Sequence, residues 1–292
     1  MANLSVGTVQ VACVQMEPHV GETGKNIERS VALIAQAADQ GARIIVLPEL
    51  ASSGYVFAER SEVEEAAEQI PGGPAVSAWT DVCREKDVYV VAGLPEAANG
   101  VFYNSCVLVG PEGHVGTYRK VHLWNEENVF FEPGDSGFPV FDTPYGRLGM
   151  IICYDCWFPE AFRSCSLLGA DFVCVPTNWV PIPGQAPAER AMANVLCQAN
   201  AHSNGVYVLA ADRVGVERGQ EFVGRSIIVD HTGWPLAGPA SLVDAEILYA
   251  EISAQKARDG RAWNKYNDPL RNRRPGEYGA LVNPSGGDGR ES

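Results

Sequence analysis

Short, continuous apolar runs alternate along this chain with amphipathic stretches of helical period, and this alternation restricts the folds it can adopt. The first apolar run, 6–16, is followed by the segment 26–40, whose apolar residues recur on one helical face up to Gly41. The apolar run 42–47 comes next. Such runs predict strands buried on both faces, and their alternation with helices predicts an α/β fold. Further helices are predicted at 74–86, 159–168 and 188–204, and further strands at 88–94, 172–175 and 206–211.

Predicted hairpins interrupt this alternation. Their paired runs, each pair flanking a Pro- and Gly-containing turn, are 102–109 with 115–121 and 139–142 with 148–153. Two late strands, 226–230 and 247–252, are expected around the turn at His231-Thr232-Gly233. Because so many hairpins are inconsistent with a purely parallel barrel, we expect mixed β-sheets with helices on the outside.

The composition changes only near the C-terminus. No linker or low-complexity run occurs before about residue 276. We therefore expect a single domain over residues 1–275. The Gly- and Ser-rich tail at 276–292 is expected to be flexible.

Charge and hydropathy argue against two classes of partner. The 292 residues include 36 acidic and 22 basic side chains, for a formal net charge of −14. This field repels nucleic-acid phosphates and anionic lipid, and weakly favours neutral or cationic small molecules. No stretch approaches the roughly 20 apolar residues that span a bilayer, and no signal peptide is recognisable at the N-terminus. We expect a cytoplasmic protein that binds a small molecule and neither nucleic acid nor membrane.

One of the eight cysteines stands apart by its position. Most lie in apolar segments and are expected to be reduced and buried. Cys153, however, ends the apolar run 148–152 and precedes a helix whose first turn holds Pro159. A thiol at such a place lies near the positive end of the helix dipole, which predicts a lowered pKa and a reactive thiolate. The alternative is one more buried structural cysteine.

Three charged residues lie at or after the ends of predicted strands. Glu49 follows the run 42–47, and a carboxylate at an apolar strand end is expected to have a raised pKa, which suits a general base. Lys120 ends the strand 115–119 and either snorkels from an edge strand or points into a cleft. Glu127 follows seven residues later. Taken singly, each has an ordinary alternative as a surface or loop charge.

Taken together and in order, these residues lie in three motifs that resemble the carbon–nitrogen hydrolase (nitrilase/amidase) superfamily. The motifs are LPEL at 47–50, YRKVHLW at 118–124 followed by Glu127, and ICYD at 152–155 followed by WFPE at 157–160. The resemblance extends from about residue 6 to RNRRPGEYG at 271–279. It implies an α/β fold of the four-layer α-β-β-α sandwich type with mixed β-sheets, assembled into a homodimer or a higher homo-oligomer.

The resemblance also implies a catalytic triad of Glu49, Lys120 and Cys153, with Glu127 as an additional glutamate. Glu49 would take the proton from the thiol, and the thiolate would attack an amide carbonyl carbon. The Lys120 ammonium and the N–H of Tyr154 would stabilise the oxyanion. Ammonia would leave a thioester, which water activated by Glu49 would hydrolyse, while Glu127 holds Lys120 charged. No metal or organic cofactor is required.

The residues after the nucleophile bear on the substrate. Tyr154-Asp155 resembles the amidase and carbamoylase branches rather than the Trp-Glu of nitrile-cleaving relatives. Cys156 and Trp157 stand where relatives that act on N-carbamoyl amino acids carry arginines, which disfavours a substrate with a carboxylate. The segment 157–160 is similar to N-carbamoylputrescine amidases. We expect a small aliphatic amide or N-carbamoyl amine, with a nitrile as the alternative. The expected pocket-lining residues, for which core packing is the alternative, are Tyr55, Trp124, Tyr154, Trp157, Asn178 and Trp179.

Other function classes use some of the same residues. Cys153 and Cys156 form a Cys-x-x-Cys motif, which in a redox protein opens a helix after a strand, but a redox role explains neither Glu49 nor Lys120. His122 is a candidate partner for a Cys–His dyad, although a structural histidine supporting the pocket wall is the simpler interpretation. A zinc site would need a second close Cys/His pair, which the sequence lacks. A binding module without catalysis remains open, but no expected catalytic residue is missing.

Overall fold

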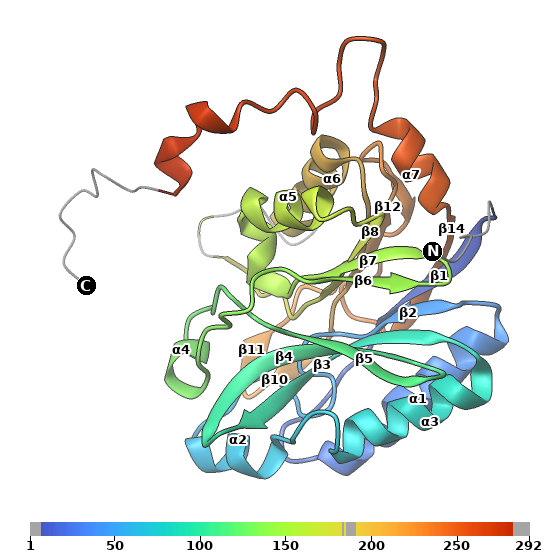
Figure 1. Cartoon of the computed structure of the whole chain (residues 1–292). Helices are drawn as coiled ribbons and strands as arrows, with labels where there is room; N and C mark the ends of the chain where they lie inside the picture. Colours follow the sequence, from blue (N-terminus) through green and yellow to red (C-terminus); the bar gives the residue numbers. More distant parts are fainter. Residues whose placement is uncertain (1–6, 183, 185–190, 283–292) are drawn as a thin grey trace.

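The structure is a computed structural model that describes residues 7–182, 184 and 191–282. Within these residues, two six-stranded sheets form the centre of the molecule (Figure 1). The first sheet has the spatial order β14 (Glu246–Ile252), β1 (Val9–Gln15), β2 (Ile44–Val46), β3 (Tyr89–Ala98), β4 (Val101–Gly110) and β5 (Gly113–Arg119). The second has the order β13 (Pro235–Ala237), β12 (Ile227–Val229), β9 (Tyr207–Ala211), β8 (Phe172–Pro176), β7 (Gly146–Met150) and β6 (Val140–Thr143). A short hairpin pairs β10 (Val216–Glu217) with β11 (Gln220–Glu221).

Both sheets are mixed, as the sequence predicts. Strands β1, β2 and β3 are parallel, and so are β7, β8 and β9, while the flanking strands pair antiparallel. The chain continues from β2 into Glu49 and from β7 into Cys153. Ligands collect at the carboxyl ends of parallel strands in open α/β sheets, so each sheet presents a motif residue at such an end.

Alternate residues of each strand divide the core into layers. Val11 and Cys13 of β1 pack in the cluster that contains the second sheet and its helices, whereas Ala12 and Val14 pack against the other face of the first sheet. This period of two is what a strand buried on both faces requires. The layers therefore run helix, sheet, sheet, helix, which confirms the predicted α-β-β-α sandwich.

Helices cover the outer face of each sheet (Figure 1). The first sheet is covered by α1 (Thr23–Asp39) and α3 (Pro74–Lys86), and the second by α5 (Pro159–Leu167) and α6 (Met192–Asn204). These confirm the predicted helices to within a few residues, except that residues 188–190 of the predicted helix 188–204 lie outside the described residues. The other described helices are α2 (Arg60–Ala66), α4 (Glu127–Phe130) and α7 (Ala254–Gly260), with short 3₁₀ turns η1 (Cys153–Trp157), η3 (Pro275–Glu277) and η4 (Gly279–Leu281).

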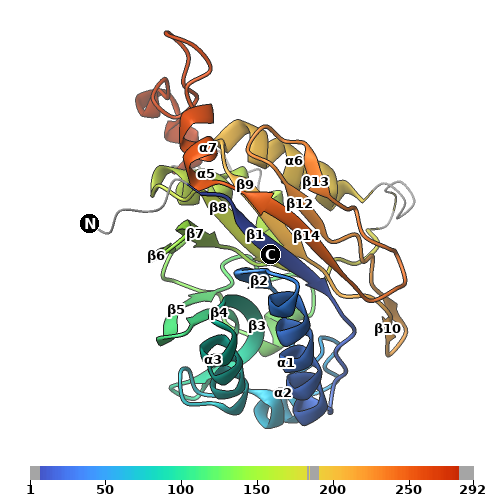
Figure 2. The same ribbon diagram turned by 90° about the vertical axis from the view of Figure 1, so that its right-hand side faces the viewer.

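The late strands do not pair around the predicted turn. The turn at His231-Thr232-Gly233 joins β12 to β13, and β14 crosses to the first sheet, where it pairs antiparallel with β1 over its whole length (Figure 2). The reason is that β1 would otherwise be the edge of the first sheet, and an edge strand of apolar residues needs a partner. The final long strand thus closes the sheet that the first strand begins.

Three remaining features bear on the expectations from the sequence. All eight cysteines are free and buried. No helix in the described part of the chain combines the length and apolar character needed to cross a membrane. Of the tail predicted to be flexible, residues 276–282 are described and include η4, while 283–292 lie outside the described residues.

Candidate active site

A strained turn after β2 carries Glu49 into the interior. Glu49 is fully buried, and the next residue, Leu50, has a left-handed φ of 48°. Backbone strain at a non-glycine residue persists only where the surrounding structure enforces it. Here Gly93 of β3 permits the close approach, because a Cβ at Gly93 would lie 2.5 Å from the Leu50 nitrogen and 2.6 Å from the Glu49 Cα. The sequence did not single out Gly93, since a glycine inside a strand has several ordinary explanations.

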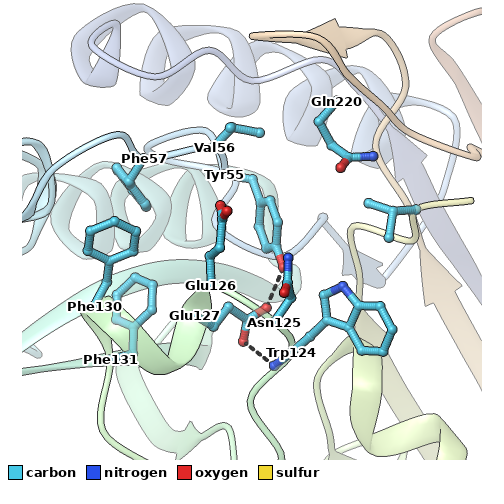
Figure 3. A pocket seen from close by; sticks show the side chains of 11 residues that line it. Tyr55, Val56, Phe57, Trp124, Asn125, Glu126, Glu127, Phe130, Phe131 and Gln220 are labelled. Carbon is cyan, nitrogen blue, oxygen red and sulfur yellow. Dashed lines mark hydrogen bonds between the residues drawn. The ribbon is translucent and has the colours of Figure 1, made fainter. Parts of the chain in front are cut away.

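The buried ammonium of Lys120 bridges two carboxylates. Its Nζ lies 2.6 Å from Glu49 Oε1 and 2.7 Å from Glu127 Oε1, and none of the three side chains is appreciably exposed. Lys120 follows β5, the edge strand, yet points into the interior rather than snorkelling to solvent. The phenol of Tyr55 donates a hydrogen bond of 2.6 Å to the same oxygen of Glu127 (Figure 3). The cluster therefore holds one positive and two negative groups out of water.

Two asparagines complete the surroundings of Glu49. Asn104 Nδ2 of β4 donates to Glu49 Oε1 at 2.7 Å, and Asn178 Nδ2 donates to the Glu49 backbone carbonyl at 2.9 Å. In the described part of the chain, Glu49 Oε2 and Asn178 Oδ1 are buried without a hydrogen-bond partner. Buried polar atoms are normally satisfied, so these two free acceptors are suited to donors that arrive with a substrate.

Cys153 lies at a second strained turn, between β7 and η1. Its φ is 44°, again left-handed for a residue that is not glycine. The carboxylate of Asp155 braces this turn, since Oδ2 accepts from the Ile152 backbone N–H at 2.8 Å and from the Tyr118 hydroxyl at 2.7 Å. The sharp turn presents the thiol at the end of the strand, and the carboxylate brace keeps it there.

The other oxygen of Asp155 links this turn to the segment that follows Lys120. Oδ1 accepts from the His122 backbone N–H at 3.2 Å and lies 2.7 Å from His122 Nδ1. The imidazole also stacks on Phe158, with ring centroids 3.5 Å apart. His122 is therefore a supporting residue, as the simpler interpretation predicts. Asp155, which lies in the motif at 152–155, braces the turn, a role that the sequence did not predict.

Burial governs the acid–base properties of the cluster. Burial raises the pKa of Glu49 from an ordinary 4.5 to about 7, although the Lys120 ammonium acts in the opposite direction. Burial disfavours the charged form of Lys120, but the Glu127 and Glu49 carboxylates outweigh it and hold the Lys120 pKa above its usual range. The predicted raised pKa of Glu49 is thus confirmed.

The predicted lowering of the Cys153 pKa is wrong. Burial, followed by the negative charge of Glu49, raises the pKa of the thiol well above its usual value, and the Lys120 ammonium offsets only part of this. A helix dipole contributes modestly and acts at short range, so it does not overcome full burial. At rest the site therefore holds a neutral thiol beside a carboxyl group that titrates near neutral pH.

Two small cavities meet at this cluster. One, of about 20 Å³, borders Cys153 and is lined by Trp124, Tyr154, Trp157, Asn178 and Trp179 among others. The neighbouring cavity, of about 50 Å³, shares Trp124 and contains Tyr55, Glu126 and Glu127 (Figure 3). All six predicted pocket-lining residues border one or both cavities. Cys156, in contrast, is buried in the core and lines neither cavity.

No group of three or more His, Cys, Asp or Glu side chains suited to a metal ion occurs among residues 7–182, 184 and 191–282.

The two face-to-face mixed sheets and their outer helices define the sandwich of the nitrilase superfamily. A carbon–nitrogen hydrolase from Helicobacter pylori G27 superposes with a TM-score of 0.84 at 28% identity, covering 95% of this chain and 99% of that one. An amidase from Nesterenkonia sp. has the same fold, with a TM-score of 0.77 at 24% identity and coverage of 96% and 99%.

Sequence comparison identifies the family. The family model for carbon–nitrogen hydrolase matches residues 10–262, so the chain belongs to this family and is a hydrolase of C–N bonds. A protein from Pyrococcus abyssi named nitrilase is 44% identical, over 92% of this chain and 99% of that protein. N-carbamoylputrescine amidase from Solanum lycopersicum is 31% identical, over 97% and 96%.

Proposed function

We propose that this protein hydrolyses a small aliphatic amide or N-carbamoyl amine through a thioester on Cys153, with release of ammonia. The observation that carries the proposal is the buried Lys120 ammonium held between Glu49 and Glu127, next to a thiol on a strained turn. A buried charge cluster of this kind is costly to fold and is typical of a catalytic site.

Glu49 acts as the general base. Its Oε2 has no partner in the described structure and its pKa of about 7 lets it accept a proton near neutral pH. Because the pKa of the Cys153 thiol is raised, a stable thiolate does not form in advance. The proton therefore moves from Sγ to Glu49 as sulfur attacks the carbonyl carbon, when the negative charge passes from sulfur to the carbonyl oxygen.

Lys120 and the backbone N–H of Tyr154 stabilise that oxyanion. When the tetrahedral intermediate collapses, the C–N bond breaks and Glu49 returns the proton to the departing ammonia. Glu49 then takes a proton from the water that attacks the thioester, and it returns this proton to the departing sulfur, which restores the thiol. An amide yields an acid, and an N-carbamoyl amine yields a carbamate that loses carbon dioxide. Glu127 keeps Lys120 charged and in place throughout.

The lining of the cavity at the thiol suits an uncharged reacting group. Its walls are mostly aromatic, which favours a flat, compact amide or carbamoyl group. Asn178 Oδ1 offers a free acceptor for an amide N–H. The net charge of −14 and the 31% identity to an N-carbamoylputrescine amidase both favour a substrate whose other end is an amine.

A second candidate is conversion of a nitrile to acid and ammonia. It is favoured by the 44% identity to the Pyrococcus abyssi protein named nitrilase. The Tyr154-Asp155 pair and the free acceptor of Asn178 favour the amide, because a nitrile carries no N–H to donate.

Ammonia release from a panel of aliphatic amides, ω-amino amides, N-carbamoyl amines and nitriles tests this ranking. We expect the largest kcat/KM for an amide or N-carbamoyl amine. Nitrile turnover well above that of the amides would reverse the ranking. A reversible Cys153–Cys156 disulfide with no hydrolysis of any of these compounds would instead favour the redox alternative.

We also predict a single domain over 1–275, which limited proteolysis tests. A homo-oligomer is predicted and is tested by light scattering of the purified protein. A cytoplasmic location is predicted and is tested by fractionation of cells.

A further inference from the structure

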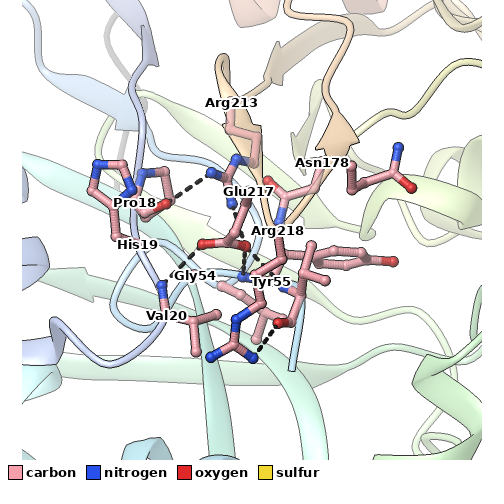
Figure 4. Close-up of polar contacts among 12 residues, drawn as sticks. Pro18, His19, Val20, Gly54, Tyr55, Asn178, Arg213, Glu217 and Arg218 are labelled. Atoms are coloured by element: carbon pink, nitrogen blue, oxygen red, sulfur yellow. Dashed lines mark hydrogen bonds and ion pairs between the residues drawn. The ribbon is translucent and has the colours of Figure 1, made fainter. Parts of the chain in front are cut away.

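A second buried ion pair lies outside the proposed catalytic cluster. Arg213, in the turn after β9, and Glu217, in β10, are both buried, and Arg213 Nη1 donates to Glu217 Oε2 at 3.0 Å (Figure 4). The guanidinium also donates through Nη2 to the Pro18 carbonyl at 2.8 Å. A buried ion pair is weak evidence for stability, because well-packed apolar residues of similar volume often stabilise a fold as well or better. The pair therefore invites a role beyond stability.

The pair fixes the backbone of the segment that carries Tyr55. Glu217 Oε2 accepts from the N–H groups of both Tyr55 and Val56 at 2.8 Å, and Oε1 accepts from the Val20 N–H at 2.9 Å. The turn before Tyr55 is built for this contact. Gly54 has a φ of 81°, and a Cβ there would lie 2.7 Å from Glu217 Oε1. The carboxylate therefore holds one rigid backbone conformation at Tyr55.

The same pair fixes the ring of Tyr55. The Arg213 guanidinium carbon lies 4.0 Å from the centre of the Phe222 ring, and Phe222 meets the Tyr55 ring edge-to-face with centroids 5.9 Å apart. At the far end of that ring the hydroxyl donates to Glu127 Oε1, the oxygen that also binds Lys120 Nζ. A continuous series of contacts thus runs from Arg213 and Glu217 through Tyr55 to the ammonium.

We propose that Arg213 and Glu217 are positioning residues for the reaction, which act through Tyr55 to hold Glu127 and Lys120 in the geometry that stabilises the oxyanion. The proposal rests on the proposed function. Displacements of about 1 Å in a catalytic group cost up to about 100-fold in rate, so a distant carboxylate that sets the Tyr55 backbone has this leverage.

A double-mutant cycle tests the proposal. Glu217→Gln keeps the side chain's size but places an amide N–H₂ where three backbone N–H groups and a guanidinium need an acceptor. We expect its kcat, per Cys153 titrated by alkylation, to fall about 10- to 100-fold with KM changed less than about twofold. In a Tyr55→Phe background, which lacks the hydroxyl, Glu217→Gln should cost less than about threefold more.

Two further variants keep the test decisive. Glu221→Gln makes the same chemical change at an exposed position of the same hairpin and should leave kcat unchanged. Phe222→Leu preserves the ion pair but removes the ring between Arg213 and Tyr55, so it serves if Glu217→Gln does not fold. Its loss of kcat should also be masked by Tyr55→Phe. The proposal would be overturned if the losses of kcat multiply when Tyr55→Phe is combined with Glu217→Gln or Phe222→Leu. It would also be overturned if Glu217→Gln leaves kcat per titrated Cys153 unchanged.

The rate at which iodoacetamide alkylates Cys153, followed by peptide mass spectrometry, separates this proposal from the proposed function. The same masking by Tyr55→Phe is expected in that rate, whatever the natural substrate. If the wild-type protein hydrolyses none of the panel compounds yet the alkylation rates show masking, the proposed function fails and the positioning role stands. If Glu217→Gln lowers the alkylation rate by the same factor with and without Tyr55→Phe, the positioning role is contradicted.

Discussion

The substitution Asn104→Leu separates the charge state of Glu49 from the rest of the site. Asn104 Nδ2 donates to Glu49 Oε1 at 2.7 Å, and this hydrogen bond favours the charged carboxylate. A hydrogen bond to a charged group contributes about 1.5–3 kcal/mol, but the Lys120 ammonium remains on the same oxygen and compensates in part. We therefore expect a loss of about 1.4 kcal/mol, which raises the Glu49 pKa from about 7 to about 8.

The consequence is a loss of activity that depends on pH. Because the base must be deprotonated, kcat/KM of the wild type should rise through about pH 7. Asn104→Leu should move the acid limb of the pH–rate profile up by about one pH unit. The deprotonated fraction of Glu49 at about pH 7 then falls from about one half to about one tenth, a fivefold loss. At about pH 9 the two proteins should differ by less than about 1.5-fold.

The assay is initial-rate ammonia release over about pH 4 to 9.5, under conditions where each protein stays folded. The matched control is Ser105→Ala, at the next position of β4, which removes a hydrogen bond of 2.7 Å to Glu96 instead. It should cost about 1 kcal/mol of stability and leave the acid limb in place. If Asn104→Leu does not move the acid limb, Glu49 is not the titrating base. If the wild-type limb lies near the ordinary carboxyl value of 4.5, the pKa of Glu49 is not raised.

Three further substitutions probe the geometry of the site. Gly93→Ala places a methyl group 2.5 Å from the Leu50 nitrogen. It should lower the free energy of unfolding, measured by urea titration, by about 1–3 kcal/mol and should also reduce kcat. Full activity would contradict the tight contact. Asp155→Asn removes one acceptor oxygen from the carboxylate that the Ile152 N–H and the Tyr118 hydroxyl contact. It should lower the free energy of unfolding by about 1–3 kcal/mol, and an unchanged urea midpoint would argue against a bracing role of Asp155. Lys120→Met leaves two buried carboxylates facing each other and should reduce kcat/KM at least about 100-fold in the ammonia assay, whereas a loss below about tenfold would exclude the ammonium from oxyanion stabilisation.

The sequence predicted what local patterns encode. Continuous apolar runs and amphipathic stretches located the strands and helices, because the burial of an element's faces depends on its own residues. It did not predict that β14 pairs with β1, since that register joins Val9 to Ile252 and depends on which sheet edge is free after the rest has folded.

The same distinction applies to the site. Glu49, Lys120 and Cys153 could be selected because each lies at a strand end within a motif. Asn104 acts through a contact with a segment far away in the chain, and nothing in its own neighbourhood marks it. Asp155 lies in a motif, but its bracing role depends on contacts with Tyr118 and His122, which the motif does not indicate. The direction of the Cys153 pKa was mispredicted for a related reason: local sequence indicates the helix that follows, but burial is produced by the whole fold.

The mass of the protein during turnover tests directly whether a thioester forms on Cys153. With a good amide substrate, acid-quenched samples taken in the steady state should contain a protein heavier by the acyl group, and peptide mapping should place that group on Cys153. Linear release of ammonia with Cys153 unmodified, and turnover retained in Cys153→Ala, would contradict the thioester mechanism.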